Sequence, residues 1–95
     1  MRLSNYEREA IREAVAKFLP DARVMLYGSR TDDTKRGGDI DILILTDQEL
    51  ELRTQLKIEA EIWKKIGEQK MDVLIEKPNA LSLFGKIVIQ QALPL

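Results

Sequence analysis

Two aspartates stand two residues apart at the start of an apolar run, Asp39-Ile-Asp41 followed by Ile-Leu-Ile-Leu, and they are the residues best suited to chemistry. Successive side chains of a β-strand alternate between its faces, so Asp39 and Asp41 are expected to point the same way. Two neighbouring carboxylates repel each other unless a cation lies between them, and a hard divalent ion such as Mg²⁺ is the natural occupant. The pair is therefore a candidate metal site.

A Gly-Ser pair, Gly28-Ser29, ends an earlier strand-like run. Glycine lets the backbone turn sharply and approach a ligand, and serine adds a hydroxyl beside backbone N–H groups that favour anions. A bare Gly-Ser is more often an ordinary turn. Arg30 follows directly and is a candidate for a further phosphate contact, with Lys35 and Arg36 as additional loop cations. Together with the aspartates, this turn suggests metal-assisted chemistry on a nucleoside triphosphate.

A third carboxylate, Asp72, lies inside the apolar run Met71–Ile75. Burying a lone carboxylate there costs several kcal/mol without a partner. If this strand lies beside the strand with Asp39 and Asp41, Asp72 completes a three-carboxylate cluster. The alternative is a strand-edge aspartate that faces water.

Composition limits the remaining possibilities. The 95 residues predict one small domain spanning 1–95, and a net charge of −1 gives no general attraction to nucleic acid or an anionic membrane. Cysteine and histidine are both absent, which excludes Cys/His zinc sites, disulfides and a Ser-His-Asp triad. We see no signal peptide and no apolar run long enough to cross a bilayer, so a cytoplasmic location is expected.

The elements that must position these residues follow the order αβ(loop)βαβα. Ser4 and Glu7 form a capping box for a first helix that stops at Pro20. Strands are expected over 23–27 and 39–45, with isoleucines on one face of the second and leucines with the aspartates on the other. A third strand is expected over 71–75.

Two further helices are expected. One begins with Thr46 or Asp47 as its cap and runs to Ile66, with Gly67 just after its end. Its buried stripe is predicted to be Leu52, Leu56, Ala60, Trp63 and Ile66. The other begins at Pro78-Asn79 and reaches Ala92, with Leu81, Phe84, Ile87, Val88 and Gln91 as helical neighbours. The predicted fold is a small α/β (α+β) domain, with a mixed sheet of three or four strands and helices packed mainly on one face.

The combined pattern is more specific than its parts. Gly-Ser, nine residues, Asp-hydrophobic-Asp with an apolar strand, and a strand aspartate after one helix resemble the nucleotidyltransferase superfamily that includes DNA polymerase β. The chain looks most like the minimal nucleotidyltransferases, small bacterial and archaeal proteins often paired with a HEPN-domain partner. The chain departs from the family pattern after Gly-Ser. Many relatives continue with a run of the Ala-Arg-Gly type, whereas this chain has Arg30-Thr-Asp-Asp33, and its two aspartates add negative charge near the expected triphosphate.

The resemblance implies roles for individual residues. Asp39 and Asp41 would coordinate Mg²⁺, and Asp72 would help to hold the catalytic metal of a two-ion site and activate the attacking hydroxyl. Gly28 and Ser29 would grip the β- and γ-phosphates of the nucleotide.

Three functions remain open at this point. The first is an Mg²⁺-dependent transfer of AMP from ATP to a hydroxyl on a partner protein, acting as antitoxin to a HEPN toxin. The second is a catalytically inactive module that neutralises or supports its partner by contact, for which the apolar segment 80–95 offers an interface. The third is a structural or metal-binding domain without a nucleotide. A second copy of the chain is a further possible partner.

Overall fold

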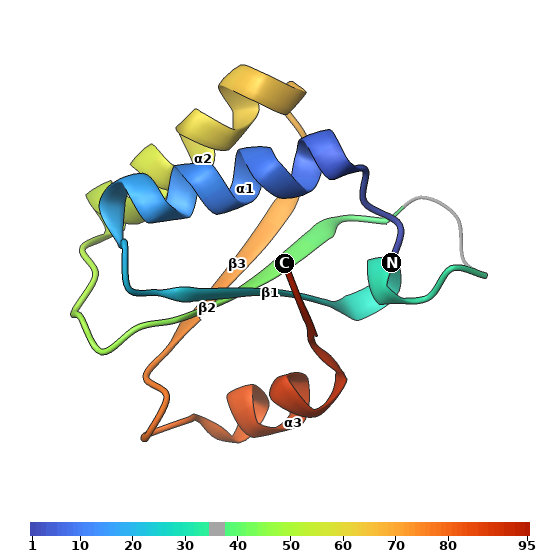
Figure 1. Cartoon of the computed structure of the whole chain (residues 1–95). Helices are drawn as coiled ribbons and strands as arrows, with labels where there is room; N and C mark the ends of the chain where they lie inside the picture. Colours follow the sequence, from blue (N-terminus) through green and yellow to red (C-terminus); the bar gives the residue numbers. More distant parts are fainter. Residues whose placement is uncertain (35–37) are drawn as a thin grey trace.

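A four-stranded mixed sheet forms the centre of the protein, with strand order β3-β2-β1-β4 (Figure 1). The computed structural model describes residues 1–34 and 38–95. The strands are β1 (Arg23–Tyr27), β2 (Ile40–Leu45), β3 (Met71–Glu76) and the short β4 (Leu93–Pro94). β1 is antiparallel to β2 and β4, whereas β2 and β3 are parallel. The three main strands lie where the sequence predicts them, and β4 was not predicted.

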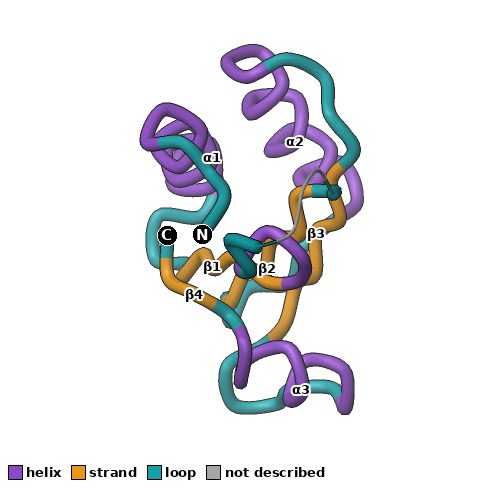
Figure 2. Tube along the Cα trace, turned by 90° about the vertical axis from the view of Figure 1, so that its right-hand side faces the viewer, coloured by secondary structure: helices purple, strands orange, loops and turns teal. Residues whose placement is uncertain are grey.

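Helices cover both faces of this sheet. Figures 1 and 2 show α1 (Asn5–Phe18) and α2 (Leu52–Ile66) on one face and α3 (Leu83–Gln91) on the other. A short 3-10 turn, η1 (Gly28–Thr31), follows β1 directly. The mixed α/β class, with most of the helices on one face, is therefore confirmed. Within the described ranges, no helix is both long and apolar enough to cross a membrane.

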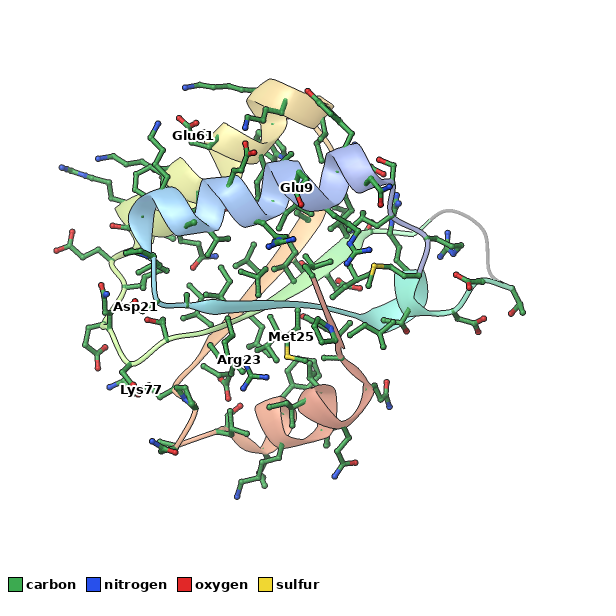
Figure 3. The ribbon with its side chains drawn as sticks, in the orientation of Figure 1. Glu9, Asp21, Arg23, Met25, Glu61 and Lys77 are labelled. Carbon is green, nitrogen blue, oxygen red and sulfur yellow. The ribbon has the colours of Figure 1, made fainter. Side chains whose placement is uncertain are left out.

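Strand β2 is buried on both faces, as predicted from its isoleucines on one face and its leucines on the other. Ile40, Ile42 and Ile44 belong to the core beneath α1 and α2, whereas Leu43 and Leu45 pack on the side of α3. Figure 3 shows Met25 of the neighbouring strand directed toward α3 as well. Because side chains alternate along a strand, Asp39 and Asp41 share the α3 side with these leucines.

The first helix begins as predicted. The Ser4 hydroxyl accepts a hydrogen bond from the Glu7 backbone N–H at 3.1 Å, and the Glu7 carboxylate accepts one from the Ser4 N–H at 2.9 Å. This reciprocal capping box satisfies two backbone donors that the first turn leaves free.

The expected start of the second helix is wrong. α2 begins at Leu52 with Glu51 as its N-cap, not at Thr46 or Asp47. Thr46 is buried at the end of β2, and its hydroxyl accepts a hydrogen bond from the Gln48 N–H at 3.2 Å. The hydroxyl therefore stabilises a turn instead of a helix, and the chain crosses to α2 over residues 46–51. The helix ends at Ile66 before Gly67, as predicted.

The buried face of α2 also differs from the prediction. Ile58 and Ile62 are fully buried, while Leu52 and Leu56 are 69% and 55% exposed and Ala60 is exposed. Trp63 and Ile66 are half-buried. The helix carries two adjacent apolar rows, and only the row with Ile58 and Ile62 faces α1 and the sheet.

The last helix is shorter than expected. α3 starts at Leu83 instead of Pro78-Asn79, and the Ser82 hydroxyl caps it by accepting a hydrogen bond from the Gly85 N–H at 3.0 Å. Its final residue is Gln91, after which the chain turns into β4. Val88 packs against the sheet, whereas three apolar residues of α3 remain exposed, namely Leu83, Phe84 and Ile87.

Candidate functional site

The sheet brings Tyr27, Asp41 and Asp72 side by side at one end. Tyr27 at the end of β1 is the register partner of Asp41 in β2. Asp41 is in turn the register partner of Asp72 in β3. Cross-strand partners on one face of a sheet have their Cβ atoms about 5 Å apart. The strand pairing therefore places two of the three predicted carboxylates next to each other.

The electrostatics of this pair are unusual for aspartate. The pKa of Asp41 is raised to about 6, first by burial, then by the negative charge of Asp72 and a hydrogen bond between the two carboxyl groups, and last by Asp39. The pKa of the Tyr27 phenol is also raised, by burial and then by Asp41 and Asp72. An added positive charge or proton is therefore favoured at this point of the protein.

Asp39 lies at the same end but interacts with a lysine. The Lys70 ammonium is 3.5 Å from the Asp39 carboxylate, and both side chains are substantially exposed. Among residues 1–34 and 38–95, no set of three acidic side chains is arranged so that it could hold a metal ion as it stands. The structure therefore brings Asp41 together with Asp72 and leaves Asp39 beside them, paired with Lys70.

Gly28 lies directly against the carboxylate of Asp41. A Cβ atom at this position would be only 2.2 Å from Asp41 Oδ2, and Gly28 has a φ of +77°, which other residues rarely adopt. Both observations require glycine here. The Gly-Ser turn thus begins in contact with the predicted metal-binding aspartate.

Ser29 is approached from the other side by the returning loop. A Cβ on Gly38 would be 2.4 Å from the Ser29 hydroxyl, and Gly38 has a φ of +92°. The Ser29 carbonyl accepts a hydrogen bond from the Arg2 guanidinium at 3.0 Å. The serine is therefore enclosed between the loop and the N-terminal segment, at the end of the sheet that holds the carboxylates.

Arg30 anchors this turn in the present structure. Its guanidinium donates to the Arg2 carbonyl at 2.9 Å and to the Gly38 carbonyl at 3.3 Å. The predicted cationic candidates Lys35 and Arg36 lie outside the described residues. Arg30 is thus the loop cation that the structure places beside the Gly-Ser turn.

The acidic loop residues that depart from the family pattern have local partners. The Asp32 carboxylate accepts hydrogen bonds from the Thr34 N–H at 2.9 Å and the Thr34 hydroxyl at 2.6 Å. The Asp33 carboxylate lies 2.5 Å from the amino group of Met1. These contacts partly offset the negative charge near the turn.

Sequence reasoning missed three residues at this end of the molecule. Tyr27 precedes Gly28 and is the cross-strand neighbour of Asp41. Lys70 directly precedes β3 and pairs with Asp39. The Phe84 ring meets the Tyr27 ring edge-on at a centroid distance of 6.3 Å. Position next to a predicted site residue could have identified Tyr27 and Lys70. Phe84 could not be found this way, because its proximity depends on α3 packing against the face of the sheet that holds the carboxylates.

Comparison with known proteins shows the family and the fold of the chain. The profile of the family described as nucleotidyltransferase domain matches residues 8–94. One similar solved structure is that of a tri-AMPylated HEPN toxin from Shewanella oneidensis in complex with an MNT antitoxin. The match has a TM-score of 0.66 at 17% identity, and it covers 93% of this chain and 67% of the other. No curated protein sequence matches this chain.

Proposed function

The chain belongs to the nucleotidyltransferase domain family, and we propose that it is an Mg²⁺-dependent enzyme that transfers AMP from ATP to a hydroxyl group. The observation that carries the proposal is the pairing of Asp41 with Asp72 across β2 and β3, directly against Gly28. These groups combine an excess of negative charge with a turn that can approach a phosphate.

The residues at this end of the sheet fit a hard divalent cation. Carboxylate oxygens are the ligands that Mg²⁺ prefers, and the pKa of Asp41 is raised first by burial and then by the negative charge of Asp72, both of which a bound cation would offset. Asp41 and Asp72 would provide the central ligands. Asp39 would join them by exchanging its exposed contact with Lys70 for the ion, which costs little because exposed ion pairs are weak.

The reaction follows from this placement. The acceptor oxygen would form a bond to the α-phosphorus, the α–β phosphoanhydride would break, and pyrophosphate would leave. Asp72, which lies on edge strand β3, would take the hydroxyl proton. Bound Mg²⁺ would supply charge neutralisation at the phosphates and lower the pKa of the attacking hydroxyl. Such transfers depend mainly on positioning and electrostatics, so no histidine or cysteine is needed.

The turn after β1 would hold the triphosphate. Gly28 allows the backbone to approach within contact distance of the metal-binding aspartate, and Ser29 adds a hydroxyl at the same point. Arg30 stands at the turn with its guanidinium half-buried against backbone carbonyls. We assign it a supporting role in holding the turn and in attracting the phosphates.

A partner protein is the proposed source of the acceptor hydroxyl. The S. oneidensis structure contains an AMPylated HEPN toxin together with an MNT antitoxin of this fold. By analogy, we propose that this chain modifies a HEPN-type partner and acts as its antitoxin. The analogy is one of fold, because the identity is 17%.

The decisive experiment is incubation with α-labelled ATP and Mg²⁺, with and without the protein encoded beside this one. Label on the neighbouring protein is expected with the wild type and not with an Asp39→Asn/Asp41→Asn double variant. Asp21→Asn is the matched control, because Asp21 is an exposed acid before β1, at the opposite end of that strand from Gly28 (Figure 3). Undiminished labelling by the double variant would refute the proposed site.

A module that neutralises its partner by contact alone is the second candidate. The observation that favours it is the exposed apolar row of α3, in which Leu83 is 81%, Phe84 54% and Ile87 59% exposed. Exposed apolar patches of this kind mark protein interfaces. Under this alternative, the Asp39→Asn/Asp41→Asn variant would bind and suppress the partner as well as the wild type does, and no label would be transferred.

A further inference from the structure

A groove of about 670 Å³ opens where α2 ends and β3 begins, at the same end of the sheet as the carboxylates. Its lining residues come from α2, from the following loop and from the first residue of β3, namely Glu59, Trp63, Glu68, Gln69, Lys70 and Met71. Lys70 connects the groove to the candidate site, because its ammonium is 3.5 Å from Asp39. No residue of this lining takes part in the proposed reaction.

Several groups in the groove lack a partner within the described part of the chain. The indole Nε1 of Trp63 is buried and makes no hydrogen bond. Burial raises the pKa of Glu59, and neither Glu59 nor Glu68 takes part in an ion pair or hydrogen bond among the described residues. The two carboxylates outnumber the one cation in the lining, Lys70, whose ammonium extends to within 3.5 Å of Asp39. The groove therefore presents an aromatic ring with two uncompensated carboxylates, a combination that suits a positively charged group.

The order of the strands indicates which part of the reaction lies over the groove. β1, β2 and β3 are neighbours in that order, and the Gly-Ser turn follows β1. With the leaving pyrophosphate at this turn and the α-phosphate near Asp41, an in-line displacement brings the attacking hydroxyl from the opposite direction. That direction passes Asp72 on the α3 side of edge strand β3 and leads around the start of this strand to its α2 side, where the groove opens.

We propose that this groove binds the acceptor, a protein segment in which the hydroxyl-bearing residue is flanked by a basic side chain. The inference rests on the proposed function and adds the substrate class to it. The basic side chain lies over the Trp63 indole between Glu59 and Glu68, and the hydroxyl reaches the carboxylates past Lys70. A nucleoside in the groove is disfavoured, because this would leave no in-line path for the acceptor.

Trp63 is the only tryptophan in the chain, so its fluorescence reports on the groove alone. The probes are short peptides that carry one tyrosine, serine or threonine, flanked by lysines in one set and by glutamates in the other. Lysine-flanked peptides are expected to change the Trp63 emission, and glutamate-flanked peptides are not. Mg²⁺ with a non-hydrolysable ATP analogue should leave the emission nearly unchanged.

Charge-removing variants sharpen the test. Glu59→Gln/Glu68→Gln should weaken binding of the lysine-flanked peptides by about tenfold, because an ion pair to half-buried Glu59 and one to exposed Glu68 each contribute a few-fold. Glu9→Gln, an exposed acid on α1 outside the groove, should bind as the wild type does. No change in emission at millimolar peptide, or equal binding by the double variant, would overturn the proposal.

Two other outcomes separate this inference from the proposed function. If the ATP analogue alone quenches Trp63, the groove holds the nucleoside and the acceptor assignment is wrong. If calorimetry shows that the analogue and Mg²⁺ do not bind at all, the proposed function fails. The peptide titrations then decide independently whether the groove recognises a basic segment.

Discussion

Asp41 and Asp72 are register partners in two parallel strands, and their carboxyl groups are close enough to share a hydrogen bond. Adjacent parallel strands turn corresponding side chains to the same face, so the two carboxylates cannot avoid each other. With Gly28 against Asp41 on the other side, the group has little freedom to move away. The arrangement therefore holds negative charge at a fixed point, where a proton or a cation can neutralise it.

This arrangement predicts an unusual pH dependence of stability in the absence of divalent metal. The folded pKa of Asp41 is about 6, above the ordinary value of 3.8. A raised pKa means that the native state binds the proton more tightly than the unfolded chain does. The stabilisation is therefore fully present below pH 3.8 and is lost as the pH rises through 6.

Thermal unfolding in EDTA checks this expectation by comparing the wild type with Asp41→Asn. As the pH rises from 4.5 to 7.5, the melting temperature of the variant should increase by a few degrees relative to that of the wild type, because asparagine carries no charge to repel Asp72. The half-exposed position of Asp41 limits the size of the effect. Parallel curves across this range would show that the pair does not titrate as described.

Binding of Mg²⁺ should reverse the loss of stability that the repulsion between Asp41 and Asp72 causes at neutral pH. At pH 7.5, Mg²⁺ at ten times its dissociation constant should stabilise the wild type by about 1.4 kcal/mol, since only the native state has the site. Asp41→Asn and Asp72→Asn should lose this gain, whereas Asp21→Asn should keep it. Scanning calorimetry with and without Mg²⁺ measures the difference, and an equal gain in all four proteins would indicate non-specific ion binding.

Gly28 gives a prediction about geometry. Gly28→Ala adds a Cβ that would meet Asp41 Oδ2 at 2.2 Å, so the carboxylate or the turn must shift. Transfer activity should fall by about a hundredfold, since a displacement of about 1 Å at reacting groups has that effect. The labelled-ATP assay measures the loss.

Gly67→Ala is the matched control for this substitution. Gly67 also has a positive φ, of +85°, but a Cβ there would have nothing within 4 Å. Backbone strain alone should cost the control about 1–3 kcal/mol of stability and leave activity intact. If both variants lose activity equally, the contact with Asp41 is not the cause.

The sequence predicts the central strands well, because local patterns determine them. The alternation of Asp39 to Leu45 and the capping box at Ser4 depend on neighbouring residues alone, and both are confirmed. The meeting of Asp41 with Asp72 depends in addition on β3 pairing with β2. The family resemblance predicts that pairing, whereas the residue pattern leaves it open.

The remaining differences come from tertiary packing. Thr46 is a good N-cap by type, but its hydroxyl is used in a turn at the end of β2. Tyr27 and Phe84 meet only because α3 lies against the face of the sheet that holds the carboxylates. Sequence periodicity identifies an apolar row but does not say which of two adjacent rows faces the core, and on α2 three members of the predicted row, Leu52, Leu56 and Ala60, are exposed.

The two rows of α2 give a last prediction, about stability. Ile62 is fully buried in the core between the helices α1 and α2 and the sheet, whereas Leu56 is 55% exposed. Ile62→Ala should lower the free energy of unfolding by about 2–5 kcal/mol, because it removes buried apolar surface and leaves a cavity. Leu56→Ala should change it by less than about 0.5 kcal/mol, as expected for a surface position. Urea unfolding measures both values. A larger loss from Leu56→Ala than from Ile62→Ala would mean that α2 packs through the row predicted from the sequence, and that the observed orientation of the helix is wrong.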